Sequence, residues 1–159
     1  MSISREIQKQ IDQLAGKLGT FKMSPVEFLS QIYVDITKIG RLNNWNEDEV
    51  VEALPENLKL LFVISDLQTR IEFDGLIAFF DNHMPEDIKQ KRKILSKLGR
   101  SPVLDEFDKA YKMFSGNTGS EELTDTINGL GEKIVETIDT KSFAAALKKT
   151  IPGLAVEWQ

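Results

Sequence analysis

The stretch FDGLIAFFDN, residues 73–82, places three phenylalanines, a leucine and an isoleucine around one glycine, with an acid near each end. Leu76, Phe79 and Phe80 have the spacing i, i+3 and i+4, which puts their side chains on one face of a helix. That spacing is typical of a buried helix face. We therefore expect the rings to pack in the interior of the protein rather than to line a ligand site.

The chain immediately before these rings has the features of a join between two helices. Gly75 permits a bend or a close approach of two backbones, because it lacks a Cβ. Asp74 is of a type that caps helix N-termini, so we expect it to cap the helix that carries the rings.

Helical signals extend from this stretch in both directions. Ser24 with Glu27, and Asn46 with Glu49, form the capping-box pattern that opens helices. No strand-like alternation is bounded by hairpin signals, whereas apolar residues recur every three or four positions in the segments 3–18, 28–39, 58–71 and 103–114. We predict an all-α, single-domain helical bundle of about seven or eight helices over residues 1–159. A flexible loop is expected at 115–120, before a C-terminal helical pair.

The bulk composition narrows the class of protein. The chain has 159 residues, of which 41% are hydrophobic and 28% charged, and it has no cysteine. Disulfides, thiolate metal sites and cysteine nucleophiles are therefore excluded. The longest apolar run, residues 60–64, is far shorter than the ~20 residues that cross a bilayer, and residues 1–10 lack the apolar core of a secretory signal. We expect a cytoplasmic protein without a membrane segment.

Charge is unevenly distributed along the chain. Residues 43–82 carry nine acids and two bases, although the net charge of the whole chain is only −5. Such an asymmetry is typical of an electrostatic binding face, although solvated helix faces produce it too. The candidate partner-binding residues are Glu47, Asp48, Glu49, Glu52 and Glu56. The alternatives are a solubility face, or first-turn acids that favour the helix dipole.

A basic run lies at residues 89–100, and we interpret it as the outward, solvated face of a helix. It has no interleaved aromatic residues, and the chain as a whole is acidic. Nucleic-acid binding is therefore not expected.

The single histidine, His83, is the first candidate for chemistry. A histidine can act as a general base, but the sequence places no nucleophile beside it, and we predict a surface-loop residue. Asp81 and Asp74 do not have helical ligand spacing with it, so no metal site is predicted. A small-ligand site or an active site around Phe79, Asn82 and His83 remains an alternative.

Nucleotide and hydrolase motifs are absent. The pair Gly129 and Gly131 lacks the third glycine and the preceding strand of a dinucleotide fingerprint, and GNTGS lacks the lysine of a phosphate loop. There is no Gly-x-Ser-x-Gly elbow and no His-Glu-x-x-His. We predict that the protein is not an enzyme and needs no cofactor.

The opening stretch resembles the hallmark of the bacterial DNA-mimic-protein family, Asn-Gly-Gly-Phe-x-Gln-Phe-Phe-x-Asn. Gly75 matches the second glycine and Leu76 replaces the first phenylalanine, while Phe79, Phe80 and Asn82 match directly. The resemblance covers roughly residues 58–114, where Leu98-Gly99 is similar to a later Ile/Leu-Gly pair. Three positions depart from the hallmark: Phe73, Asp74 and Ala78 replace an asparagine, a glycine and a glutamine. The packing part of the motif is therefore kept, and its polar part is largely lost.

This resemblance implies a helical bacterial protein, in a family of mostly uncharacterised domains. The best-known type is an acidic dimer that occupies the DNA-binding surface of a transcriptional regulator. Our leading hypothesis is a non-enzymatic domain that binds a protein with a basic surface through residues 47–56. The second hypothesis is an immunity or antitoxin-like protein that neutralises a toxin. Homodimer formation is left open.

Overall fold

Two of the three phenylalanines in residues 73–82, Phe79 and Phe80, are buried inside an all-α architecture, whereas Phe73 is 81% exposed. We analysed a computed structural model, which describes residues 4–17, 22–116, 120–151, 154 and 157–158. The described part contains nine α-helices, one 3₁₀ turn and one pair of two-residue strands. The helices are α1 (Arg5–Lys17), α2 (Pro25–Leu42), α3 (Glu47–Ala53), α4 (Glu56–Asp74), α5 (Leu76–Asp81), α6 (Pro85–Leu95), α7 (Pro102–Ser115), α8 (Glu121–Ile138) and α9 (Lys141–Thr150). The 3₁₀ turn is Ser96–Leu98, directly after α6.

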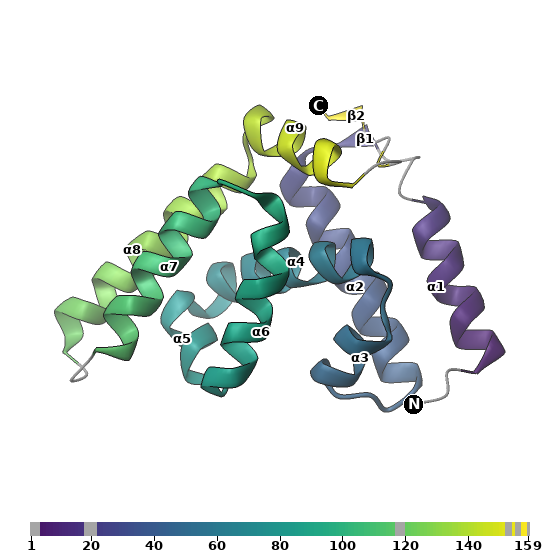
Figure 1. Ribbon diagram of the computed structural model, residues 1–159, viewed down its shortest axis with the longest axis horizontal. Coiled ribbons are helices and arrows are strands. Elements are labelled where there is room, and N and C mark those ends of the chain that lie inside the picture. Colours follow the sequence, from purple (N-terminus) through teal and green to yellow (C-terminus); the bar gives the residue numbers. More distant parts are fainter. Residues whose placement is uncertain (1–3, 18–21, 117–119, 152–153, 155–156, 159) are drawn as a thin grey trace.

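The predicted all-α fold class is confirmed, with one or two more helices than expected. The two strands, β1 (Lys22–Met23) and β2 (Glu157–Trp158), form a short parallel pair that places the segment between α1 and α2 beside the segment after α9 (Figure 1). The predicted flexible loop at 115–120 falls partly outside the described residues.

Helix α4 forms the centre of the fold. It contacts α2, α3, α5, α6 and α8, whereas α7 and α8 lie side by side at one edge and α1 lies at the other (Figure 1). A helix whose side chains are apolar nearly all round is expected to be central. Nine consecutive positions, from Leu60 to Gln68, are buried and make up 9 of the 11 buried α4 residues. Three polar residues in that run, Ser65, Asp66 and Gln68, are buried as well.

The join at Gly75 has the predicted bend but a different cap. Gly75 has φ 84°, a conformation that side chains rarely permit, and it separates α4 from α5. Asp74 is the last residue of α4 and does not cap α5, so that prediction is wrong. Asn128 of α8 supplies the acceptor instead, since its Oδ1 accepts the backbone N–H of Ile77 at 3.1 Å. A side chain 51 positions away in sequence therefore performs the expected local function.

The rings pack as expected from their spacing. Leu76, Phe79 and Phe80 are at most 1% exposed. Phe79 and Phe80 meet three aromatic residues of α7, and we call this set the ring cluster: Phe79, Phe80, Phe107, Tyr111 and Phe114. It attaches α5 to α7.

Candidate functional site

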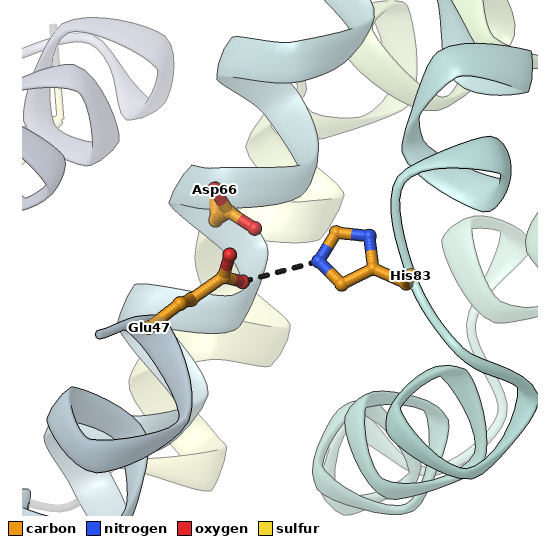
Figure 2. Close-up of side chains that lie close together, drawn as sticks. All are labelled: Glu47, Asp66 and His83. Atoms are coloured by element: carbon orange, nitrogen blue, oxygen red, sulfur yellow. Dashed lines mark hydrogen bonds and ion pairs between the residues drawn. The ribbon is translucent and has the colours of Figure 1, made fainter.

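A second cluster, made of charged side chains, adjoins the ring cluster, because the ring of His83 packs on Phe79. We call it the charge network, and its five members are Glu47 of α3, Asp66 and Arg70 of α4, His83 of the α5–α6 loop and Lys91 of α6. Figure 2 shows Glu47, Asp66 and His83 converging from three separate elements. Their potential ligand atoms all lie within 4.8 Å of one another.

Glu47 is the centre of the network. Its Oε1 accepts from the Lys91 ammonium at 2.6 Å and from His83 Nε2 at 3.3 Å, while its Oε2 accepts from Arg70 at 3.0 Å. Burial alone would raise the pKa of Glu47, but the hydrogen bond from His83 and the positive charge of Lys91 hold it well below the usual range. Glu47 is therefore an anion that joins α3 to α4 and α6.

The histidine takes part in this network as a cation. Nδ1 of His83 lies 2.6 Å from the carbonyl oxygen of Phe79, which can only accept a hydrogen bond. Nε2 faces Glu47, which also only accepts when ionised. Both ring nitrogens must then donate, which requires the imidazolium, and the hydrogen bond to Glu47 accordingly raises the pKa of His83.

Two of our predictions for this region are wrong. His83 was expected on a surface loop, but only 7% of its side chain is exposed, because its ring packs on Phe79 at a centroid distance of 4.5 Å. Lys91 was expected on an outward face, but it is 4% exposed. Lys91 turns inward because Glu47 offers it a counter-ion, whereas its neighbours Lys89 and Arg92 are exposed.

Asp66 is the member of the network with unused hydrogen-bonding capacity. It is 2% exposed, and its Oδ1 accepts from Arg70 Nε at 3.0 Å. Its Oδ2 is buried and has no hydrogen-bond partner among the described residues. Burial, together with the negative charge of Glu47, raises the pKa of Asp66 to about 6.

The arrangement of Glu47, Asp66 and His83 is that of possible metal ligands, but the surrounding charges oppose a metal ion. Lys91 and Arg70 already donate to both oxygens of Glu47. A divalent cation would have to displace an ammonium or a guanidinium and approach a histidine that carries a positive charge. The site therefore fits an internal ion network better than a metal centre.

The remaining residues predicted for the partner-binding surface lie in different environments. Asp48 and Glu52 are exposed on α3, and they have no ion-pair partner in the part of the chain that the structure describes. Glu49 completes the capping box of α3, because its Oε2 accepts the Asn46 backbone N–H at 2.7 Å. Glu56 is exposed and pairs with Lys59 and Lys97.

Among the residues named for an alternative ligand site, Phe79 and His83 pack against each other, but they do not share one environment with Asn82. Phe79 is part of the buried ring cluster, whereas Asn82 ends α5 as its C-cap and is exposed. Only His83 belongs to the charge network. The network itself escaped the sequence analysis because its members come from four elements. One local signal was available: Asp66 and Arg70 are four positions apart in a helix, which is the spacing of an i, i+4 ion pair.

None of the described helices is both long enough and apolar enough to cross a membrane. Comparisons with family models, with curated proteins and with solved structures found no match to the chain. The resemblance of residues 58–114 to the DNA-mimic-protein family therefore stays a prediction.

Proposed function

We propose that this protein is a non-catalytic binding domain, and that the exposed acids of α3 engage a protein with a basic surface. The observation that carries the proposal is the contrast within α3. Glu47 points inward and is paired with three cations, whereas Asp48 and Glu52 are exposed and lack ion-pair partners among the described residues. Asp48 and Glu52 are four positions apart, so they project from one side of the helix.

The contacts of Glu47 favour a rigid presentation of these two acids. The hydrogen bonds from Arg70, His83 and Lys91 fix the first turn of α3 against α4 and α6. A helix held in this way presents its outer charges without a further loss of conformational entropy on binding. Like charges on one helix face repel each other weakly, and a cationic partner would relieve that repulsion.

Two kinds of basic protein could bind the exposed acids of α3. A basic DNA-binding surface of a regulator corresponds to the DNA-mimic resemblance, and a toxin corresponds to an immunity-type protein. We expect the domain to act in the cytoplasm. The identity of the partner, once captured and purified, distinguishes the two kinds.

A matched pair of double variants tests the surface. Asp48→Asn/Glu52→Gln removes two charges with i, i+4 spacing from α3, and Glu132→Gln/Glu136→Gln removes two exposed charges with the same spacing from α8. A partner captured by the immobilised wild-type chain is purified, and Kd is measured by calorimetry at low and high salt. We expect about tenfold weaker binding and a flatter salt dependence for the α3 variant only. Equal Kd values for the two variants would exclude this surface.

A further inference from the structure

A pocket of about 180 Å³ lies between α2, the turn after it, α3 and α4, next to the charge network. Its polar lining is formed by Thr37, Arg41, Glu47, Asp66 and Arg70. Its aromatic lining is formed by Tyr33, Trp45 and Phe62. The pocket therefore combines flat apolar walls with a small number of convergent polar groups, which is the usual composition of small-molecule sites.

The buried oxygen of Asp66 indicates which chemical group a ligand of this pocket carries. Asp66 is 2% exposed and lines the pocket, and its Oδ2 has no partner among the described residues. A buried carboxylate oxygen without a hydrogen bond is costly, because desolvation is not compensated. A ligand that brings an N–H group to Oδ2 would supply the missing bond.

The pocket lining carries two guanidinium groups and two carboxylates, so it disfavours a ligand group with a single charge inside the pocket. A cation would meet the guanidinium groups of Arg70 and Arg41, with Lys91 and the His83 imidazolium behind them. An anion would meet the carboxylates of Asp66 and Glu47, which both line the pocket. A neutral ligand with a hydrogen-bond donor avoids both repulsions.

Size and shape point to one planar ring. A dry cavity of ~150 Å³ holds benzene, so a pocket of about 180 Å³ holds one six-membered ring with a small substituent. The rings of Tyr33 and Phe62 are nearly parallel, with centroids 6.2 Å apart and an interplanar angle of 7°. Such walls favour a flat ligand that stacks on them.

We propose that this pocket binds a neutral single-ring nitrogen heterocycle, with an N–H or amino group that donates to Oδ2 of Asp66. The ligand lies against Tyr33, Phe62 and Trp45. This binding is independent of the protein-binding surface, because Asp48 and Glu52 do not line the pocket.

The same heterocycle occurs free and as the base of a nucleotide. Arg41 lines the pocket, is exposed and has no ion-pair partner in the described ranges. It could therefore hold a phosphate outside the pocket while the ring enters. Cytosine and cytidine 5′-monophosphate distinguish the two sources, since both carry the same amino group.

Calorimetric titration with three probes tests the ligand class. Cytosine has a ring and an amino donor, cytidine 5′-monophosphate adds a phosphate, and pyrimidine has a similar ring without any N–H. We expect saturable binding of cytosine or of its nucleotide, and binding of pyrimidine that is at least about tenfold weaker, because the bond to a charged acceptor is lost. The indole N–H signal of Trp45 should shift on binding, and a Trp158→Phe variant assigns it.

Two variants test the position of the site. Asp66→Leu removes the acceptor, and Thr37→Phe fills the pocket while it leaves Asp66 in place, which covers the case in which the first variant fails to fold. Each should weaken binding at least about tenfold, whereas Asp48→Asn/Glu52→Gln should bind as the wild type does. Absence of saturable binding by cytosine and its nucleotide, equal binding of cytosine and pyrimidine, or wild-type affinity in folded variants at position 66 or 37 would each overturn the proposal.

Discussion

The ring cluster and the charge network meet at Phe79 and His83, near the end of the short helix α5, and stabilise the fold through different interactions. The ring cluster is apolar, and Phe80 alone contacts four other rings at centroid distances of 5.3 to 5.8 Å. The charge network is a set of partly desolvated ions around Glu47. Phe79 joins them, since its ring packs in the cluster and its carbonyl oxygen accepts from His83.

This difference has a consequence for stability. Burial of rings is favourable wherever the cavity is filled, and it does not depend on pH or on a particular partner. A buried ion pair has a desolvation cost that nearly offsets its attraction, so its loss is harmful mainly when one charge is left unpaired. We therefore expect the ring cluster to contribute most of the stability and the charge network to contribute most of the pH dependence.

The largest expected effect is the loss of a ring. Phe80→Ala should destabilise the fold by about 3 to 5 kcal/mol, through lost burial and the cavity that remains. Denaturation in guanidinium chloride at two pH values measures this change, which should be nearly the same at both. Phe73→Ala is the matched control, because Phe73 is 81% exposed, and its change should stay within about 0.5 kcal/mol.

The second effect comes from removal of the central anion. Glu47→Gln leaves the buried ammonium of Lys91 without its counter-ion, and we expect a loss of about 3 kcal/mol. The double variant Glu47→Gln/Lys91→Met should be more stable than Glu47→Gln, since no charge is stranded at position 91. Glu52→Gln, which removes an exposed charge from the same helix, serves as the control. A double variant no more stable than Glu47→Gln would show that Lys91 is not paired as described.

The ring cluster and the charge network also differ in how far the sequence predicts them. The i, i+3, i+4 spacing of Leu76, Phe79 and Phe80 is local, so the burial of the rings follows from the helix period. Glu47, Asp66, His83 and Lys91 lie 8 to 44 positions apart, and the hydrogen bonds from His83 and Lys91 to Glu47 depend on how separate elements pack. Sequence reasoning therefore assigns such side chains to solvated faces, which is the usual place for them.

The third prediction is that ionisation of Asp66 makes the stability of the protein depend on pH. The groups that face Asp66 are Glu47, Arg70, Lys91, His83 and, across the pocket, Tyr33 and Arg41. Its pKa is raised from 3.8 to about 6 by burial and by Glu47, so the folded state binds the proton more tightly than the unfolded state does. The stability of the wild type should fall as pH rises from 4 to 7, by about 2 to 3 kcal/mol from this group.

His83, like Asp66, makes the protein less stable as pH rises. Glu47 has the opposite effect, because it makes the protein less stable as pH falls. The raised pKa of His83 gives stability that is present below about pH 6.5 and is lost as pH rises through its folded pKa. The stability due to Glu47 is lost only as pH falls below about 4.5. Asp66→Asn removes one ionisation, so its stability relative to the wild type should increase between pH 4 and pH 7. A constant difference across that range would contradict the burial of an ionising Asp66.

The smallest expected change in stability comes from alanine substitution of a glycine in α8, where that helix packs against the start of α5. The two glycines to compare are Gly131 and Gly129. A Cβ at Gly131 would lie 2.8 Å from Cβ of Leu76 and 3.2 Å from Cγ2 of Ile71, whereas a Cβ at Gly129 would meet nothing within 4 Å. Gly131→Ala should therefore separate α8 from α5 and destabilise the protein by about 1 to 2 kcal/mol.

Gly129→Ala is the internal control, and it should change stability in the opposite direction. Both substitutions gain helix propensity by ~0.5 to 1 kcal/mol, but only Gly131→Ala places its Cβ against Cβ of Leu76, an atom that cannot move without the backbone. Thermal unfolding of the two variants measures the difference. Because Asn128 of the same helix caps α5 through Ile77, a displacement of α8 should also weaken that cap and transmit the strain to the rings of α5. Equal stabilisation by both substitutions would mean that α8 does not pack closely on Leu76, and the ring cluster would then lack one of its supports.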